Sequence, residues 1–388
     1  MEINTELNPT PHSERNHGIE LLRIFAMLLA AVLHILKKGG VITASEGNLA
    51  AYSTVWLLEA AAYCAVNCYA LISGYVGYSD RPKPLRLARC IELWLQVVFY
   101  SVIITTVYCI AGVGPVGVSD FADAFLPVTS KQYWYFTAYI GMFFFIPLLN
   151  ALVRRLNRRA LVSLCIMLIA VFSLYDTFAS FWKKDPLALV GGHSPLWLGV
   201  LYIFGAAMKK LRVPESMSSK KALLIYASAA VFTALFKITG DRLLRFVPGS
   251  LFVRDTSPTV LLCAAALLVA FARFKPGRKL TEFAVLFAPA AFGVYLLHVS
   301  PLVFEHVIGN RFAFIGRLPF PLIPFAVLAS AGVILAVGLA ADKVRILLFK
   351  ALGVPKLCRK AEKSIFIIIV GSKKFGLNFL EFAVFGKR

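Results

Sequence analysis

Apolar segments of nearly 20 residues recur along the whole chain, separated by short stretches that hold most of the charge. About ten of these segments are long enough to form a spanning helix, which needs about 20 apolar residues. They lie roughly at 19–36, 55–78, 91–113, 132–152, 160–178, 195–209, 221–238, 257–272, 283–304 and 319–342. This pattern predicts an all-α membrane protein, a polytopic bundle of about ten transmembrane helices.

The composition agrees with a membrane protein and not with a soluble one. Hydrophobic residues make up 59% of the 388 residues and charged residues only 16%, whereas a soluble domain is about one quarter charged. The formal net charge of +21 would point to nucleic acid in a soluble protein. Here it is better explained by basic loops at an anionic membrane surface. We therefore expect a lipid bilayer as a partner and no nucleic acid.

The distribution of Lys and Arg over the loops predicts the orientation of the helices. The loops after the second, fourth, sixth and eighth spans hold 17 of these residues, and the alternate loops hold 10. The first set is expected in the cytoplasm, and an even number of spans then places both termini there. The chain divides into a cytoplasmic segment at 1–17, a transmembrane domain at 18–345 and a basic cytoplasmic tail at 346–388. Apolar clusters in the tail, at 364–370 and 375–386, predict an amphipathic anchor at the interface.

The first span is apolar except for Glu20, Arg23 and His34. Arg23 and His34 are eleven positions apart, so they share one helix face and lie roughly 16 Å apart along the axis. An arginine and a histidine inside a hydrophobic span are costly and need a reason. Taken singly, Arg23 is also explained as a flanking residue whose side chain reaches the membrane interface, and His34 as a residue that caps the far end of the helix. The pair at this spacing favours a reactive site.

Two further stretches near the same membrane face hold candidate ligand-binding residues. Ser73 and Tyr75 flank Gly74 in LISGY, where small residues permit close helix packing or a local opening that lines a cavity. Arg86 and Arg89 lie i, i+3 on one helix face and suit phosphate groups. Helix packing and ordinary anchoring by positive charge explain the same residues without a ligand.

Aromatic and histidine side chains mark two later spans. Trp134, Tyr135 and Tyr139 fall at the predicted outer interface, where they form an aromatic belt or stack on a sugar ring. Tyr295 and His298 lie i, i+3 in the ninth span. A histidine in the middle of a membrane is more often functional than not, although a hydrogen bond to a neighbouring helix is the alternative for His298.

Several motifs are missing from the sequence. It has no Gly-x-x-x-x-Gly-Lys-Ser/Thr, no Gly-x-Ser-x-Gly and no His-Glu-x-x-His, which argues against nucleotide hydrolysis, a soluble-type serine hydrolase and a zinc protease. The seven cysteines show no metal-type spacing and mostly lie in apolar runs, where packing explains them. No metal cofactor is expected.

The ordered motifs resemble the acyltransferase-3 family of membrane acyltransferases. They are Arg23-x10-His34, LISGY at 71–75, LRLAR at 85–89, YWYFTAY at 133–139, LWLGVLYIFGAAMKK at 196–210 and FGVYLLH at 292–298. The resemblance covers about residues 16–350. Each motif is weak alone, but their order and spacing together are specific. The subfamily that YWYFTAY and FGVYLLH resemble is that of bacterial surface-polysaccharide O-acetyltransferases.

The resemblance implies an activity and a set of residue roles. Members of the family move an acyl group, commonly acetyl, from cytoplasmic acyl-CoA to a sugar or another acceptor. By resemblance, His34 is the essential histidine, Arg23 is its partner at the acyl donor, and Arg86 and Arg89 form the family's basic stretch. The implied partners are acetyl-CoA as donor and a glycan or lipid-linked sugar as acceptor, in the bacterial cytoplasmic membrane. Some relatives carry an appended extracytoplasmic hydrolase-like domain, so direct transfer or a separate transferase partner is expected here.

The residues suit acyl transfer, and two other classes of function compete with it. A histidine is the natural general base for an acceptor hydroxyl near neutral pH, and transient acylation of His34 or a nearby tyrosine is the alternative. A secondary transporter or flippase would use Arg23, His34 and His298 to line a path, but the chain shows no pair of matching halves. A purely structural scaffold leaves the intramembrane charges unexplained.

The loop charges predict which loops a topology reporter finds in the cytoplasm. A reporter fused after Arg159 is expected to report the cytoplasm, and one fused after Gly249 the outer side. Alkaline phosphatase and fluorescent-protein fusions at both positions measure this. The reverse pattern would contradict both the orientation and the direction of transfer.

Overall fold

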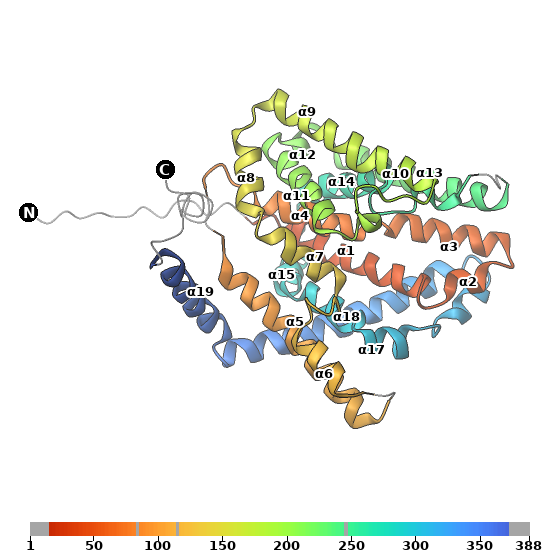
Figure 1. The fold of residues 1–388 in the computed structure, drawn as a ribbon. Helices are drawn as coiled ribbons and strands as arrows, with labels where there is room; N and C mark the ends of the chain where they lie inside the picture. The colour runs from red at the N-terminus through yellow and green to blue at the C-terminus, as the bar shows by residue number, and fades with distance from the viewer. Residues whose placement is uncertain (1–14, 83–84, 114–115, 244–246, 372–388) are drawn as a thin grey trace, which may run out of the picture.

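Helices make up the regular structure of the chain. A computed structural model describes residues 15–82, 85–113, 116–243 and 247–371, and within these ranges it has no strand (Figure 1). The principal helices are α1 (His17–Leu36), α3 (Leu49–Ala62), α4 (Ala65–Gly77), α5 (Leu87–Ala111), α7 (Trp134–Phe143), α8 (Ile146–Arg155), α9 (Arg158–Ile169), α10 (Asp176–Phe181), α11 (Pro195–Lys210), α13 (Ser219–Arg242), α14 (Pro258–Arg273), α15 (Arg278–Phe287), α16 (Ala291–His298), α18 (Ile323–Ala351) and α19 (Val354–Gly371). Short helices are α2 (Val41–Ser45), α6 (Val118–Phe125), α12 (Val213–Ser216) and α17 (Pro301–Val303).

Most of the predicted spans are single long helices or pairs joined end to end. In the described ranges, seven helical stretches are long and apolar enough to cross a bilayer: His17–Leu36, Leu49–Gly77, Leu87–Ala111, Arg158–Phe181, Ser219–Arg242, Arg278–His298 and Ile323–Ala351. The pair α7 and α8, bent by 57°, makes an eighth if it is one span. The two shortest predicted runs are the 16-residue helices α11 and α14. Every predicted apolar run is therefore helical, and the all-α membrane fold is confirmed.

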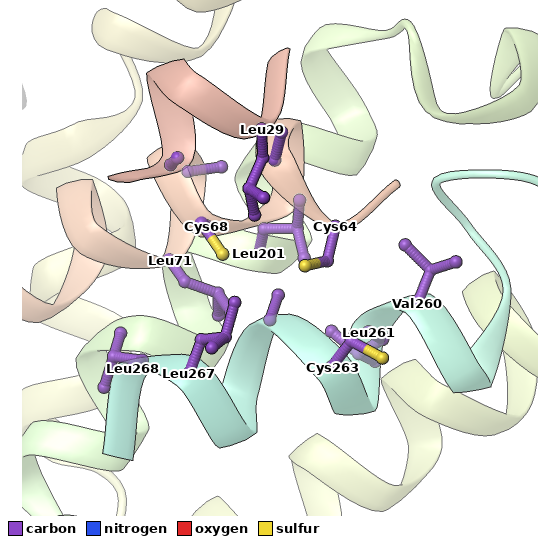
Figure 2. Packing of buried hydrophobic residues seen from close by; sticks show 14 of the residues in the cluster. Leu29, Cys64, Cys68, Leu71, Leu201, Val260, Leu261, Cys263, Leu267 and Leu268 are labelled. Atoms are coloured by element: carbon purple, nitrogen blue, oxygen red, sulfur yellow. The ribbon is translucent and has the colours of Figure 1, made fainter. Parts of the chain in front are cut away.

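Helix α1 lies at the centre of the bundle, with α3, α4, α14, α16 and α18 packed around it (Figure 1). It begins where the side chain of Asn16 accepts a hydrogen bond from the Ile19 amide, which satisfies one of the free amides of the first turn. Figure 2 shows the apolar packing between its Leu29 and the residues of α4, α11 and α14, including Cys64, Cys68 and Cys263. These cysteines are free and buried, so they serve as small packing residues.

Two glycines allow α4 and α11 to cross in close backbone contact. A Cβ atom on Gly74 would collide with the carbonyl of Tyr202, and one on Gly205 would collide with the carbonyl of Leu71. The Gly74 of LISGY is thus explained by close helix approach, the packing alternative for this motif. The crossing fixes the positions of Ser73 and Tyr75, which flank Gly74 in the sequence.

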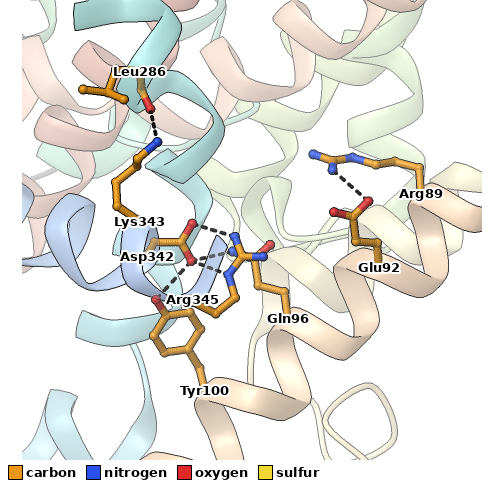
Figure 3. Close-up of polar contacts among 8 residues, drawn as sticks. All are labelled: Arg89, Glu92, Gln96, Tyr100, Leu286, Asp342, Lys343 and Arg345. Atoms are coloured by element: carbon orange, nitrogen blue, oxygen red, sulfur yellow. Dashed lines mark hydrogen bonds and ion pairs between the residues drawn. The ribbon is translucent and has the colours of Figure 1, made fainter. Parts of the chain in front are cut away.

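A buried carboxylate of α18, that of Asp342, fastens α5 to α18 (Figure 3). The Asp342 carboxylate accepts hydrogen bonds from both Nε and Nη2 of Arg345, at 2.9 and 2.7 Å. It also accepts one from Gln96 and one from Tyr100 of α5, each at 3.0 Å. Asp342 is fully buried, and such a charge is tolerated when every acceptor position is filled. These bonds hold the helix whose first turn carries Arg89.

The C-terminal helix packs against α5. The predicted boundary of the transmembrane domain at 345 falls inside α18, which continues to Ala351. Beyond it α19 includes the apolar run 364–370, and the Glu362 carboxylate accepts a hydrogen bond from the Ala88 amide at 3.1 Å. That bond caps the first turn of α5, which has no side-chain cap of its own. The second predicted cluster of the tail, 375–386, lies outside the described residues, as does most of the predicted segment 1–17.

Substitution at Gly205 is expected to destabilise the protein. Gly205→Ala places a methyl group against the Leu71 carbonyl, and overpacking of this kind costs about 1–3 kcal/mol. Gly199→Ala in the same helix is the matched control, because no other atom lies within 4 Å of its added methyl group. Thermal unfolding of the purified protein should show a lower midpoint for Gly205→Ala only, and equal midpoints would contradict the close crossing.

Candidate active site

A cavity of about 380 Å³ lies between α1, α4, α5 and α7, and we call it the inner cavity. It collects six of the residues predicted from sequence, namely Arg23, Ser73, Arg86, Arg89, Tyr135 and Tyr139. Tyr69 and Tyr202 also line it. Neither was predicted as a site residue, because a tyrosine in an apolar helix is equally explained by packing. The structure therefore joins the arginines of the first and third spans in one place.

The inner cavity is cationic. Arg23 enters from α1, Arg86 precedes the first residue of α5, and Arg89 lies in the first turn of that helix. Among the described lining residues there is no carboxylate, and the nearest partner of Arg89 is Glu92 outside the lining, at 3.4 Å (Figure 3). Guanidinium groups bind phosphate with two parallel hydrogen bonds. The arrangement suits a phosphorylated ligand.

Tyrosines of α4 and α7 line the inner cavity, and a tyrosine of α16 contacts one of them. Tyr69 donates a hydrogen bond to the Arg23 carbonyl at 2.9 Å, and its ring lies against that of Tyr135, with centroids 6.2 Å apart. Tyr295 accepts a hydrogen bond from the Tyr135 amide at 3.4 Å. We call Tyr69, Tyr135 and Tyr295 the tyrosine layer. Tyr69 and Tyr135 share the lining with the arginines, and Tyr295 lies three residues before His298 on α16.

Two of the aromatic residues predicted to stack on a sugar or to form an outer belt line the inner cavity. Tyr135 and Tyr139 share the inner cavity with the arginines, because α7 is short and bent against α8. The bend follows from Pro147, which lacks the amide that would bond to the Phe143 carbonyl. Tyr75 lies outside the inner cavity and lines a second cavity beside it. Trp134, the third aromatic residue of this group, does not line the inner cavity.

His34 and His298 form a hydrogen-bonded pair. Their Nδ1 and Nε2 atoms are 2.9 Å apart, although the residues are 264 positions apart in sequence. His298 is 3% exposed, whereas His34 is only partly buried, with the edge of the Phe304 ring beside it. Two histidines from different spans thus meet at the end of α1 farther from Arg23.

The hydrogen bonds of the pair determine which nitrogen of His34 is free for chemistry. The Nδ1 of His298 lies 2.6 Å from the carbonyl oxygen of Val294, which only accepts, so this nitrogen carries the proton. In neutral His298 the Nε2 atom is then an acceptor, and the Nδ1 of His34 must donate to it. Neutral His34 is left with a lone pair on Nε2. That atom is able to accept a proton from a substrate.

A third polar group lies near the same end of the bundle and was not found from sequence. The His193 ring stacks on Trp134 with centroids 3.9 Å apart, and its Nε2 lies 3.2 Å from a carboxylate oxygen of Asp255. Burial raises the pKa of Asp255, and His193 and Lys37 oppose that shift. Asn67 holds the Asp255 carbonyl at 2.7 Å. His193 follows a non-helical turn, so no periodic pattern marks it in the sequence.

Within the described ranges, no three His, Cys, Asp or Glu side chains gather as a metal site. The candidate site consists of the arginine-lined inner cavity, the tyrosine layer and the histidine pair. All three lie along α1 and the helices that contact it.

Comparison with known proteins identifies the family. A family model described as an acyltransferase domain, that of the acyltransferase-3 family, matches residues 16–341. No curated protein and no solved structure matches the chain. The matched region contains the inner cavity and both histidines, from Arg23 to His298. The chain belongs to the acyltransferase-3 family and is a multi-pass membrane acyltransferase.

Proposed function

We propose that the protein transfers an acetyl group from acetyl-CoA, bound from the cytoplasm, to a hydroxyl of a cell-surface or lipid-linked glycan. The observation that carries this proposal is the placement of Arg23 in a phosphate-type cavity on the same helix as a paired histidine. The bacterial cytoplasmic membrane is the proposed location. The resemblance to surface-polysaccharide O-acetyltransferases supports the choice of acetyl group and acceptor.

The distance between the two parts of the site matches the donor. Arg23 and His34 are separated by roughly 16 Å along α1. The phosphopantetheine arm of CoA has about 13 bonds between phosphorus and sulfur, comparable to four to five extended residues, or roughly 15 Å. Phosphate bound by Arg23, Arg86 and Arg89 would place the thioester beside His34. The arm passes the tyrosine layer, so Tyr69, Tyr135 and Tyr295 have to move apart when the donor binds.

His34 is assigned as the general base. Its Nε2 takes the proton of the acceptor hydroxyl while the oxygen attacks the thioester carbonyl. The carbon–sulfur bond then breaks, the new ester forms, and the proton on His34 passes to the departing thiolate. His298 holds the ring in the tautomer that this step needs. The products are the acylated glycan and free CoA.

The acceptor is expected to approach from the outer side. His34 lies at the end of α1 that the loop charges assign to that side. Lys37 is close enough to Asp255 to affect its pKa, which connects the end of α1 to the group formed by Trp134, His193 and Asp255. An aromatic ring beside polar side chains suits a sugar. Direct transfer by this chain is therefore proposed, with a separate transferase partner as the other route.

Replacement of His34 is expected to abolish transfer without loss of donor binding. General-base catalysis contributes about 10²–10⁴-fold, so His34→Ala should lower the rate of CoA thiol release by a factor in that range. His306→Ala is the matched control, since His306 lies beside Tyr108 and outside the site. Thiol release by purified protein with acceptor-containing membranes measures this. A loss for His34→Ala that stays within tenfold would contradict the assignment.

The arginine pair is expected to act on donor affinity. Arg86→Ala combined with Arg89→Ala should raise the KM for acetyl-CoA, because two phosphate-binding groups leave the inner cavity. Arg158→Ala combined with Arg159→Ala removes equal charge from the same membrane face, away from the cavities, and should leave the KM unchanged. Equal KM values for the two double variants would make Arg86 and Arg89 topology anchors only.

A further inference from the structure

A second, larger cavity lies beside the inner one, and we call it the basic vestibule. Its volume is about 1100 Å³, and it is formed by the ends of α1, α4, α11 and α14 together with α12 and the start of α15. All of these ends belong to the membrane face that the loop charges assign to the cytoplasm. The volume is enough for a ligand of nucleotide size.

Positive charge dominates the lining of the basic vestibule. Its described lining includes the six basic residues Arg15, Lys209, Lys210, Arg212, Arg273 and Lys275, against the two acidic residues Asp80 and Glu215. Some of the basic groups support the fold: Lys210 donates to three backbone carbonyls at the end of α8, at 2.7 to 2.9 Å. Arg273 donates to the carbonyls of Pro214 and Glu215. Arg15 and Lys275 are exposed side chains of the same lining, and Arg15 also pairs with the Glu20 carboxylate at 3.1 Å.

The basic vestibule and the inner cavity are lined by the same helix faces. On α11, Tyr202 lines the inner cavity and Lys209 the vestibule. At α15 and the turn after it, Thr281 lines the vestibule and Ala288 the inner cavity. At α1, Asn16 lines the vestibule and Arg23 the inner cavity. Each pair is seven positions apart, which is two helical turns or about 10 Å. In all three cases the vestibule residue lies toward the predicted cytoplasmic face.

We propose that the basic vestibule binds the nucleotide end of the acyl donor, an adenosine that carries a 3′-phosphate. The inference rests on the proposed function, and it divides the donor between three levels of one path. The adenosine and its 3′-phosphate lie in the vestibule, the pyrophosphate lies at Arg23, Arg86 and Arg89, and the thioester lies at His34. Charge supports this order. The phosphate groups would lie in the two cavities lined by arginine and lysine, and the uncharged pantetheine arm would lie between Arg23 and His34, where α1 is apolar.

Aromatic side chains in the vestibule suit the base. The Tyr75 ring lines the vestibule with the Lys209 ammonium 5.9 Å from its centroid, and Phe274, just after α14, lines it as well and is 44% exposed. Adenine binds by stacking on such rings, which needs no particular hydrogen-bond pattern. This gives Tyr75 a place at the donor, one cavity farther out than Ser73.

Donor fragments separate the vestibule from the rest of the path. Acetyl-CoA contains the adenosine 3′-phosphate, and S-acetyl-4′-phosphopantetheine lacks it but keeps the phosphate next to the arm. For Arg15→Glu combined with Lys275→Glu, we expect the KM for acetyl-CoA to rise by about tenfold. The kcat should stay unchanged, and so should both constants for the phosphopantetheine donor. An equal rise for the two donors would overturn the proposal, because it would show a general effect of the substitutions.

A binding measurement makes the test independent of catalysis. Adenosine 3′,5′-bisphosphate should bind the purified wild-type protein, less tightly at higher ionic strength, and about tenfold more weakly to the Arg15→Glu, Lys275→Glu variant. Lys279→Glu is the control for Lys275→Glu, because Lys279 is exposed, close in sequence and outside the vestibule lining. Equal binding by the double variant and the Lys279→Glu protein would overturn the nucleotide site. Binding that depends on Lys275 in a protein that releases no thiol from either donor would support the site and contradict the proposed function.

Discussion

Polar groups inside an apolar bundle have to find their partners within the protein, and this constraint organises the structure. No water in the membrane core can replace a missing hydrogen bond, so an unpaired buried group costs several kcal/mol. The Asp342 carboxylate meets the requirement with donors from Arg345, Gln96 and Tyr100. The same rule joins His34 to His298 and His298 to the Val294 carbonyl. The bonds from Gln96 and Tyr100 fix α5 against α18, and the bond between His34 and His298 fixes α1 against α16.

The fixed helices place the chemistry in order along α1. Its start borders the basic vestibule, Arg23 lies two turns deeper in the inner cavity, and His34 lies near its far end. The close crossing of α4 and α11 forms the wall on one side of the two cavities. On the other, the Asp342 cluster and the Glu362 cap hold α5, which presents Arg86 and Arg89. The residues proposed for donor binding and for catalysis are thus separated by depth along α1, which suits the proposed transfer from one side of the membrane to the other.

Local pattern predicted those parts of the site that depend on a single helix. Arg23 and His34 share a face because their spacing fits the helical repeat, and Arg86 and Arg89 follow for the same reason. The contact between His34 and His298 was not predictable, since it depends on how α16 packs against α1. That Tyr135 and Tyr139 share a cavity with the arginines was not predictable, since it depends on how α7 packs against α4 and α5. His193 lies after an irregular turn, where sequence periodicity carries no information.

In the proposed reaction, an acyl group leaves a donor on one side of the membrane and becomes an ester. The most direct test uses the purified protein in liposomes that contain a lipid-linked glycan. Acetyl-CoA labelled in its acetyl group is added outside. Liposomes whose protein exposes the vestibule to the outside are compared with liposomes of the opposite orientation. The prediction is alkali-labile label in the glycan and free CoA on the vestibule side. Label that crosses the bilayer without forming an ester would contradict acyl transfer and indicate transport.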